Sequence, residues 1–155
     1  MVVKVKHTKG KHYASLLSLL KIYFASLFLK DREVYISFTE DSKYNLNNRN
    51  KMDWSKAIGR GGLSYGKDGG QGYPTRKNEE FIVWRYDIEN DEFHVANTYA
   101  RKNHRMQLPD YWLKCKVGDR VKTNMRLFKG VVPIGGYFGG NDPAPNDLTY
   151  TIHLK

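Results

Sequence analysis

The C-terminal stretch from residue 135 to residue 154 constrains the fold of this chain more than any other. Paired glycines at 135–136 and 139–140 flank the aromatic dipeptide Tyr137-Phe138, and a polar loop with two prolines follows. Adjacent glycines let a backbone adopt positive φ or approach a neighbour closely, as at a tight corner. Residues 148–154 then alternate strictly, so that one face is apolar: Leu148, Tyr150, Ile152 and Leu154. A closing strand of this kind needs a sheet that is already formed, so the ending predicts a β-rich domain.

Further short strands are predicted along the chain, at residues 2–7, 33–39, 81–86, 92–99, 111–116 and 120–128. Residues 81–86 and 92–99 form a hairpin around the turn at 87–91. In its second strand Phe93, Val95, Asn97 and Tyr99 share one face, and His94, Ala96 and Thr98 share the other. A tight turn at 117–119 joins the next two strands. Short alternating strands separated by such turns indicate an antiparallel sandwich or barrel.

An apolar stripe at helical spacing precedes these strands. Its members recur mostly at i+4 or beside such positions: Tyr13, Leu16, Leu17, Leu20, Phe24, Leu27 and Phe28. Four lysines lead into this run, as in a signal peptide, but Lys21 interrupts it and no small-x-small cleavage site precedes Lys30. The run is also too short and too charged for a membrane span. We predict that residues 1–30 form a strand and an amphipathic helix packed on a sandwich domain of residues 31–155, with a membrane or secretion role as the alternative.

Two segments between the strands have other predicted forms. Asp53 can cap one helical turn that extends to Gly59. The run from Gly59 to Gly72 contains seven glycines. A phosphate-binding loop would need Gly-Lys-Ser/Thr, whereas Gly66-Lys67 is followed by Asp68. We therefore expect a surface loop that becomes ordered on a ligand.

The chain carries a formal net charge of +10, from 26 Lys and Arg against 16 Asp and Glu. This excess favours association with polyanions such as nucleic acid, anionic lipid or acidic polysaccharide, or with an acidic protein. A merely solvated basic surface explains it equally well. The single cysteine, Cys115, cannot form an internal disulfide and is expected to be a buried thiol. A reducing, cytoplasmic location is therefore favoured.

Three segments together carry a resemblance. They are Asp53-Trp54-Ser55-Lys56, Val83-Trp84-Arg85-Tyr86 with the following hairpin, and Tyr137-Phe138-Gly139-Gly140-Asn141 with Ala144-Pro145-Asn146-Asp147. Over residues 33–154 the chain resembles a group of small, largely uncharacterised bacterial and phage proteins, and its ending is similar to that of concanavalin-like jelly rolls, including some polysaccharide lyases. The resemblance implies a mostly β fold, a jelly-roll sandwich with one N-terminal helix.

Lyases of that fold place a tyrosine, a histidine and arginines on a concave sheet. Here the matching residue types near one hairpin are Arg85, His94, Tyr99, His104 and Arg105. His94 and Tyr99 are five residues apart, however, so a regular strand directs them to opposite faces. The Tyr-x-Lys-x-Tyr strand of such lyases is also absent. We therefore favour a protein without catalytic residues.

These observations predict a non-enzymatic module that binds a polyanion (nucleic acid or acidic glycan) or an acidic partner through one basic sheet face and its loops. The predicted contacts are Arg85, Tyr99, Arg101, Lys102, Arg105, Lys122 and Arg126. Two alternatives stay open, a phage or bacterial accessory protein that binds another protein and a carbohydrate-binding or lyase-like domain. No cofactor or metal is expected, because Asn141, Asp142, Asn146 and Asp147 suit turn capping better than Ca²⁺ ligation. A membrane partner is not expected, and the oligomeric state is left open.

Overall fold

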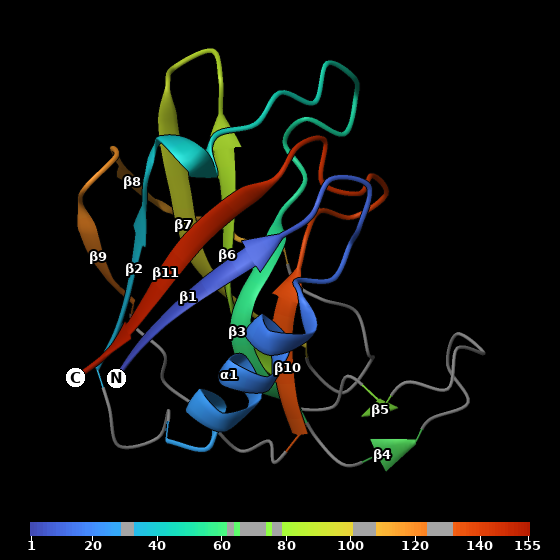
Figure 1. Cartoon of the computed structure of the whole chain (residues 1–155), viewed down its shortest axis with the longest axis vertical. Helices are drawn as coiled ribbons and strands as arrows, with labels where there is room; N and C mark the ends of the chain where they lie inside the picture. The colour runs from blue at the N-terminus through green and yellow to red at the C-terminus, as the bar shows by residue number, and fades with distance from the viewer. Residues whose placement is uncertain (29–32, 62–63, 66–73, 76–78, 101–107, 124–131) are drawn as a thin grey trace.

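The chain folds as two antiparallel sheets packed face to face, with one helix against an edge of the sandwich (Figure 1). The computed structural model describes residues 1–28, 33–61, 64–65, 74–75, 79–100, 108–123 and 132–155. The four-stranded sheet has the order β1 (Val2–His7), β11 (Leu148–Leu154), β2 (Val34–Phe38) and β9 (Arg120–Thr123). The five-stranded sheet has the order β10 (Val132–Tyr137), β3 (Ser55–Gly61), β6 (Glu79–Asp87), β7 (Glu92–Ala100) and β8 (Leu113–Cys115). A separate ribbon pairs β4 (Ser64–Tyr65) with β5 (Pro74–Thr75). The predicted mostly β sandwich with a helix near its N-terminus is confirmed.

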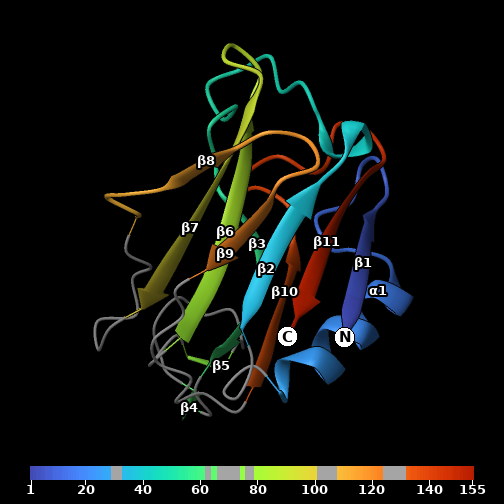
Figure 2. The same cartoon turned by 90° about the vertical axis from the view of Figure 1, so that its left-hand side faces the viewer.

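Strand β11 completes the four-stranded sheet from its interior. It pairs with β1 on one side and with β2 on the other, so strands from both ends of the chain lie side by side (Figure 2). The four apolar side chains predicted to share a face, Leu148, Tyr150, Ile152 and Leu154, are all buried. Strand β1 and the helix that follows it are therefore built into the sandwich together with residues 33–155.

The core between the sheets is largely aromatic. The rings of Phe38 and Phe93, from opposite sheets, stack with centroids 4.2 Å apart. Trp84 is fully buried among Phe38, Phe138 and Tyr150. The buried Tyr150 hydroxyl donates to the carbonyl oxygen of Ala57 at 3.0 Å, which ties β11 to β3 across the core. These ring contacts and the Tyr150 hydrogen bond hold the two sheets against each other.

The first glycine pair supplies a close approach that no other residue allows. Gly135 has φ +152°, and a Cβ atom there would lie 2.6 Å from the carbonyl oxygen of Ala57. Gly136 has φ +63°, and its Cβ would lie 2.9 Å from Leu19 Cδ2 and 3.0 Å from Ile22 Cδ1. The predicted close approach is thus present, but the glycine pair lies inside β10, whose pairing with β3 continues on both sides of it. The helix meets β10 at Gly136.

Helix α1 (Leu16–Ser26) begins at Ser15, whose hydroxyl accepts a hydrogen bond from the amide of Ser18 at 3.3 Å. It packs against β10 and β1. The prediction that its apolar stripe faces the domain is wrong, because the buried residues are Ser18, Ile22, Ala25 and Ser26. Contacts on the other side of the helix hold it in this orientation: Leu19 and Ile22 pack against Gly136, which has no side chain, and the Ser18 hydroxyl accepts from the Lys6 amide at 2.9 Å. The larger apolar side chains are left on the outside.

Two local predictions change in the structure. The segment after Asp53 is not a helical turn but strand β3, because it pairs with both β10 and β6 in the interior of a sheet. The turn at 117–119 is present, with Gly118 at φ +88°, but it does not close a hairpin. It carries the chain from β8 in one sheet to β9 in the other. Pairing across the sandwich decides both outcomes, and local sequence does not encode it.

Other predictions are confirmed where the structure describes them. The hairpin joins β6 and β7 with the expected faces, and Cys115 is buried in the core, where burial raises the pKa of its thiol to about 12. The carboxylates of the last loop, which were predicted to cap their own turn, instead bond to distant segments: Asp142 accepts from Asn50 at 2.8 Å, and Asp147 accepts from the Lys9 amide at 2.8 Å. Residues 62–63 and 66–72 of the glycine-rich run and residues 124–128 of the predicted sixth strand lie outside the described ranges.

No helix in the described part of the chain combines the length and the apolar character that crossing a bilayer requires.

Candidate functional site

The outer face of the four-stranded sheet gathers basic side chains that lie far apart in the sequence. The strand register places Lys4, Thr151, Ser37 and Arg120 in one row across β1, β11, β2 and β9. The neighbouring row contains Val2, His153, Tyr35 and Lys122. Lys6 extends the first edge, and Lys155 follows β11. We call the surface formed by Lys4, Lys6, Arg120, Lys122 and Lys155 the basic face.

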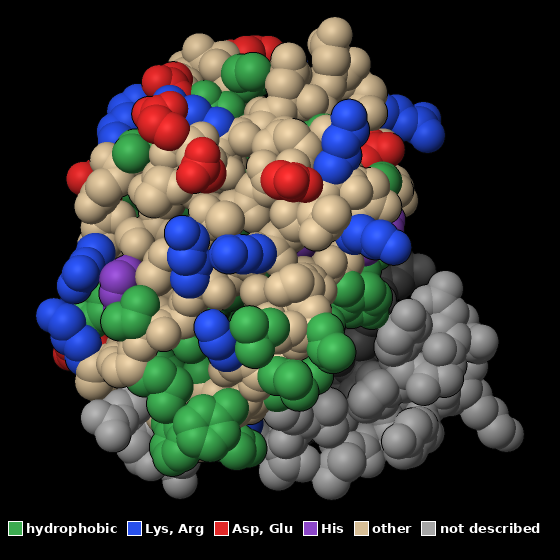
Figure 3. Space-filling view, in the orientation of Figure 1, with side chains coloured by type: hydrophobic (Ala, Val, Ile, Leu, Met, Phe, Trp, Pro, Cys, Tyr) green, Lys and Arg blue, Asp and Glu red, His purple; other side chains and the backbone are tan. Residues whose placement is uncertain are grey.

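The charged side chains that the four strands contribute to the basic face are all positive. None of the four strands contains an Asp or a Glu. The acidic side chain that reaches the face is Glu33, just before β2, and it binds Lys122 Nζ at 2.5 Å and the Tyr35 hydroxyl at 2.8 Å. Figure 3 shows Lys and Arg side chains over β1, β11 and β2, whereas acidic side chains gather toward the opposite end. The four strands therefore contribute cations and no carboxylate to the basic face.

A polar strip separates the two basic edges. Ser37, Thr149 and Thr151 are partly exposed on the central strands, and Ser37 Oγ lies 2.9 Å from His153 Nε2. Strands in a sheet are about 4.8 Å apart, so Lys4 on β1 and Arg120 on β9 are separated by roughly 14 Å at the backbone. A ligand lying across the strands would therefore meet hydroxyl groups in the middle of the sheet, with cations on β1 at one side and cations on β9 at the other.

Two titratable side chains of the basic face, His153 and Glu33, have shifted pKa values. The pKa of His153 is lowered, first by burial and then by the positive charges of Arg120 and Lys155. The pKa of Glu33 is also lowered, because Lys122 and Tyr35 donate hydrogen bonds to its carboxylate. For His153 burial is the larger cause, and the neighbouring cations lower its pKa further.

The structure separates the residues that the sequence predicted as one site. Lys122 lies on the basic face, whereas Arg85 lies on the outer face of the five-stranded sheet and is buried. Position 99 pairs with Glu80 in a β6–β7 ladder that has no register shift, so positions 94 and 99 have opposite parity, as expected. The side chain of Tyr99 and all of Arg101, Lys102, Arg105, Arg126 and His104 lie outside what the structure describes.

Arg85 is the centre of a second cluster. Its guanidinium carbon lies 4.0 Å from the ring centroid of Trp54 and 4.7 Å from that of Trp112, which is close enough for cation–π interaction with both. Arg85 also donates to His94 Nδ1 at 2.9 Å and to the carbonyl oxygen of Met52 at 3.1 Å. We call Trp54, Arg85, His94 and Trp112 the tryptophan–arginine cluster. Its cation is committed to these partners and is not an exposed contact for a polyanion.

Two carboxylates next to the cluster raise the question of a metal. Ligand atoms of Asp87, Glu92 and His94 all lie within 4.8 Å of one another. Because Arg85 Nε always carries its hydrogen, His94 Nδ1 is the acceptor, and Nε2 carries the proton that is shared with Glu92 at 3.0 Å. A ligating nitrogen needs a free lone pair, so neither ring nitrogen is available in this arrangement.

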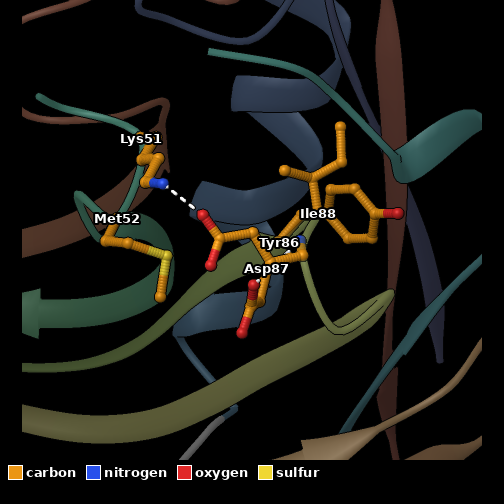
Figure 4. Close-up of a pocket in the computed structure, with 6 residues that line it drawn as sticks. Lys51, Met52, Tyr86, Asp87 and Ile88 are labelled. Atoms are coloured by element: carbon orange, nitrogen blue, oxygen red, sulfur yellow. Dashed lines mark hydrogen bonds and ion pairs between the residues drawn. The ribbon is translucent and has the colours of Figure 1, made fainter. Parts of the chain in front are cut away.

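A shallow depression lies beside this cluster, lined by Lys51, Met52, Tyr86, Asp87, Ile88 and Glu89 (Figure 4). An ion pair between Lys51 Nζ and Glu89 Oε1, 2.5 Å apart, spans it. Asp87 accepts hydrogen bonds from Glu89 and Asn90 within the β6–β7 turn. The polar groups are therefore used to hold the turn together.

Sequence reasoning missed most of the basic face. The alternation of Val3 and Val5 with Lys4 and Lys6 was a sufficient signal for the first edge, since it predicts an outward-facing lysine pair. Arg120 and Lys155 had no such signal, because their proximity to Lys4 depends on the order β1-β11-β2-β9. The same is true of Trp54 and Trp112, which meet only across the outer face of the five-stranded sheet.

Comparison with family models, with characterised proteins and with solved structures gives no match to this chain. The resemblance to jelly-roll proteins of bacteria and phages therefore stays a prediction, and the function has to be argued from the site itself.

Proposed function

We propose that the protein is a non-enzymatic module that binds a polyanion through the basic face. The observation that carries this proposal is the strand register: it aligns four cations, Lys4, Lys6, Arg120 and Lys122, on one face of strands that contain no carboxylate. A flat, positive and hydroxyl-bearing surface suits a chain of phosphate, sulfate or uronate groups, because each anion finds a cation and a hydrogen-bond donor nearby.

Arg85 contributes little to such binding, because it is buried and already paired. Lys122 contributes less than Lys4 or Arg120, since Glu33 neutralises part of its charge. The proposal therefore keeps the predicted class of ligand and one of its predicted contacts, and it transfers the remaining role to residues on β1, β9 and the C-terminus.

The test is a titration of labelled single-stranded DNA and of labelled heparin with the full chain at several salt concentrations. Binding through four phosphate contacts gives a slope of log K against log salt of about −3 for a single strand. Double substitution of Lys4→Gln and Arg120→Gln should roughly halve that slope. Binding that does not respond to salt or to this substitution would exclude the basic face as the site.

A carbohydrate-binding function is the second candidate, and the tryptophan–arginine cluster favours it. Trp54 and Trp112 are partly exposed, and Glu92 and Lys114 lie beside them with an N–O distance of 3.6 Å. Indole rings beside donors and acceptors suit the apolar faces and hydroxyl groups of a sugar. Glycan-array binding that persists at high salt and disappears in Trp112→Ala would establish this candidate instead.

A further inference from the structure

The proposed function leaves the exposed face of α1 without a role. Its large apolar side chains lie outside, with exposed fractions of 73% for Leu16, 63% for Leu17, 56% for Leu20 and 57% for Phe24. The same face continues with Tyr23, Leu27 and Phe28, all of which are exposed. At 3.6 residues per turn these seven residues cover an arc of about 140° of the helix surface. We call them the apolar helix face.

The helix is inverted relative to an ordinary surface helix. Its small and hydroxyl-bearing residues, Ser18, Ala25 and Ser26, face the sandwich together with Ile22, and Leu19 packs partly buried against the core. The other Leu and Phe side chains face outward. Monomeric soluble proteins rarely expose so continuous an apolar surface, and larger patches of this kind mark interaction sites. Packing inside the domain does not explain the pattern, because the interior contacts are already made by the other side of the helix.

Charge around the apolar helix face selects the partner. Lys21 lies at the edge of the exposed arc, and Lys4, Lys6, Lys9 and Lys11 are exposed on the adjoining strand and turn. The sequence contains no acidic residue before Asp31. Figure 3 shows the apolar side chains over α1 with basic side chains beside them and no acidic side chain among them, on the same side of the molecule as the basic face.

We propose that the apolar helix face seats in the headgroup region of an anionic lipid bilayer, with its lysines and the basic face against the charged surface. Helices that lie in a membrane interface have these two features: their Leu and Phe side chains enter the boundary between headgroups and acyl chains, and their flanking lysines pair with anionic lipids. The helix lies in the plane of the interface and does not span it. This partner differs from the sequence expectation, which assumed that the apolar stripe was buried.

A second copy of the chain is a poorer occupant. A two-fold interface brings the same patch of both copies together, so Lys21 and its neighbours would approach their own equivalents. Like charges at close range disfavour such a contact, whereas anionic headgroups neutralise them. The charge pattern thus favours lipid over self-association.

The experiment measures co-sedimentation of the full chain with vesicles of phosphatidylcholine alone and of phosphatidylcholine mixed with phosphatidylglycerol. We expect binding to the mixed vesicles only. The double variant Leu20→Ser with Phe24→Ser should lose roughly tenfold or more in vesicle affinity, because two apolar side chains no longer leave water. Ile88→Ser, which changes an apolar residue that is 44% exposed on the β6–β7 turn, is the matched control and should bind as the parent does.

A second readout reports the position of the helix directly. In the variant Phe24→Trp, brominated phosphatidylcholine in the mixed vesicles should quench the fluorescence of the introduced tryptophan. Bromine on an acyl chain quenches a tryptophan only at contact distance, so quenching places residue 24 at the depth of the acyl chains. Absence of quenching in sedimented protein would overturn the proposal. So would a dimer in analytical ultracentrifugation that Leu20→Ser with Phe24→Ser dissociates, with no sedimentation on vesicles.

The lipid proposal uses the basic face, and thus the proposed function, only as one source of positive charge. The lipid proposal and the polyanion function can therefore fail separately. If Lys4→Gln with Arg120→Gln abolishes DNA and heparin binding while the serine variant leaves vesicle binding intact, the polyanion function stands and the helix proposal fails. If the serine variant alone abolishes vesicle binding and neither DNA nor heparin binds the parent, the helix proposal stands and the polyanion function fails.

Discussion

His7 is a buried titratable residue whose environment has a measurable consequence. Its ring lies between Phe138 and Tyr150, with centroids 6.1 and 6.0 Å away, and neither ring nitrogen has a hydrogen-bond partner in the described part of the chain. Burial lowers the pKa of His7 from 6.5 to about 4. The unfolded chain therefore binds a proton between these values while the folded chain does not, and stability must fall as pH falls through that window.

We expect the free energy of unfolding to fall by about 2 kcal/mol between pH 7 and pH 5 because of His7 alone, which lowers Tm by a few degrees. Urea denaturation at both pH values measures this loss. His7→Leu, which keeps an apolar ring-sized volume, should show a smaller loss than the parent. Equal losses in both proteins would mean that His7 is protonated in the folded state as well.

Arg85 allows a second prediction at the level of one side chain. Its replacement by Ala removes two cation–π contacts and leaves His94 Nδ1 and the Met52 carbonyl oxygen without their donor. We expect a loss of roughly 2–4 kcal/mol in the free energy of unfolding, because a charge-assisted hydrogen bond contributes about 1.5–3 kcal/mol. Arg49→Ala, at an exposed loop position, is the control and should change stability little.

At the scale of elements, the contact between α1 and β10 depends on one glycine. Gly136→Ala places a methyl group in the positive-φ region and against Leu19, Ile22 and Ala14. Gly10→Ala is the matched control: its methyl group is also at a positive φ, +81°, but has nothing within 4 Å, so this variant measures the cost of the backbone conformation without the steric contact. We expect Gly10→Ala to cost about 1 kcal/mol and Gly136→Ala to cost at least about 1 kcal/mol more. Equal costs would show that α1 does not press on this corner.

The elements themselves were largely predictable, because strict alternation encodes a strand wherever one face is buried. Strands β1, β2, β6, β7 and β11 follow from it directly. The orientation of α1 was not predictable from its period, since a helix with one apolar and one small-residue side can turn either way. Gly136, more than a hundred residues away in the chain, contacts the side of the helix that carries Leu19 and Ile22, and the local sequence pattern does not encode this contact.

At the scale of the whole molecule, the basic face exists only because of strand order. The net charge of the chain predicted a polyanion partner, but it did not predict where the cations converge. Lys4 and Arg120 are brought into one row by two strands, β11 and β2, that lie between them in space. The predicted grouping of Arg85 with Lys122 failed for the same reason, since β6 and β9 belong to different sheets.

The most direct test of polyanion binding by the basic face is the salt dependence of DNA affinity in charge-reversed variants. Lys4→Glu with Arg120→Glu introduces two negative charges into one row of the basic face, whereas Arg49→Glu places one in a loop outside it. The double variant should lose DNA binding at every salt concentration, and Arg49→Glu should keep the slope of the parent. Parallel salt responses in all three proteins would contradict the proposal that this sheet face is the binding site.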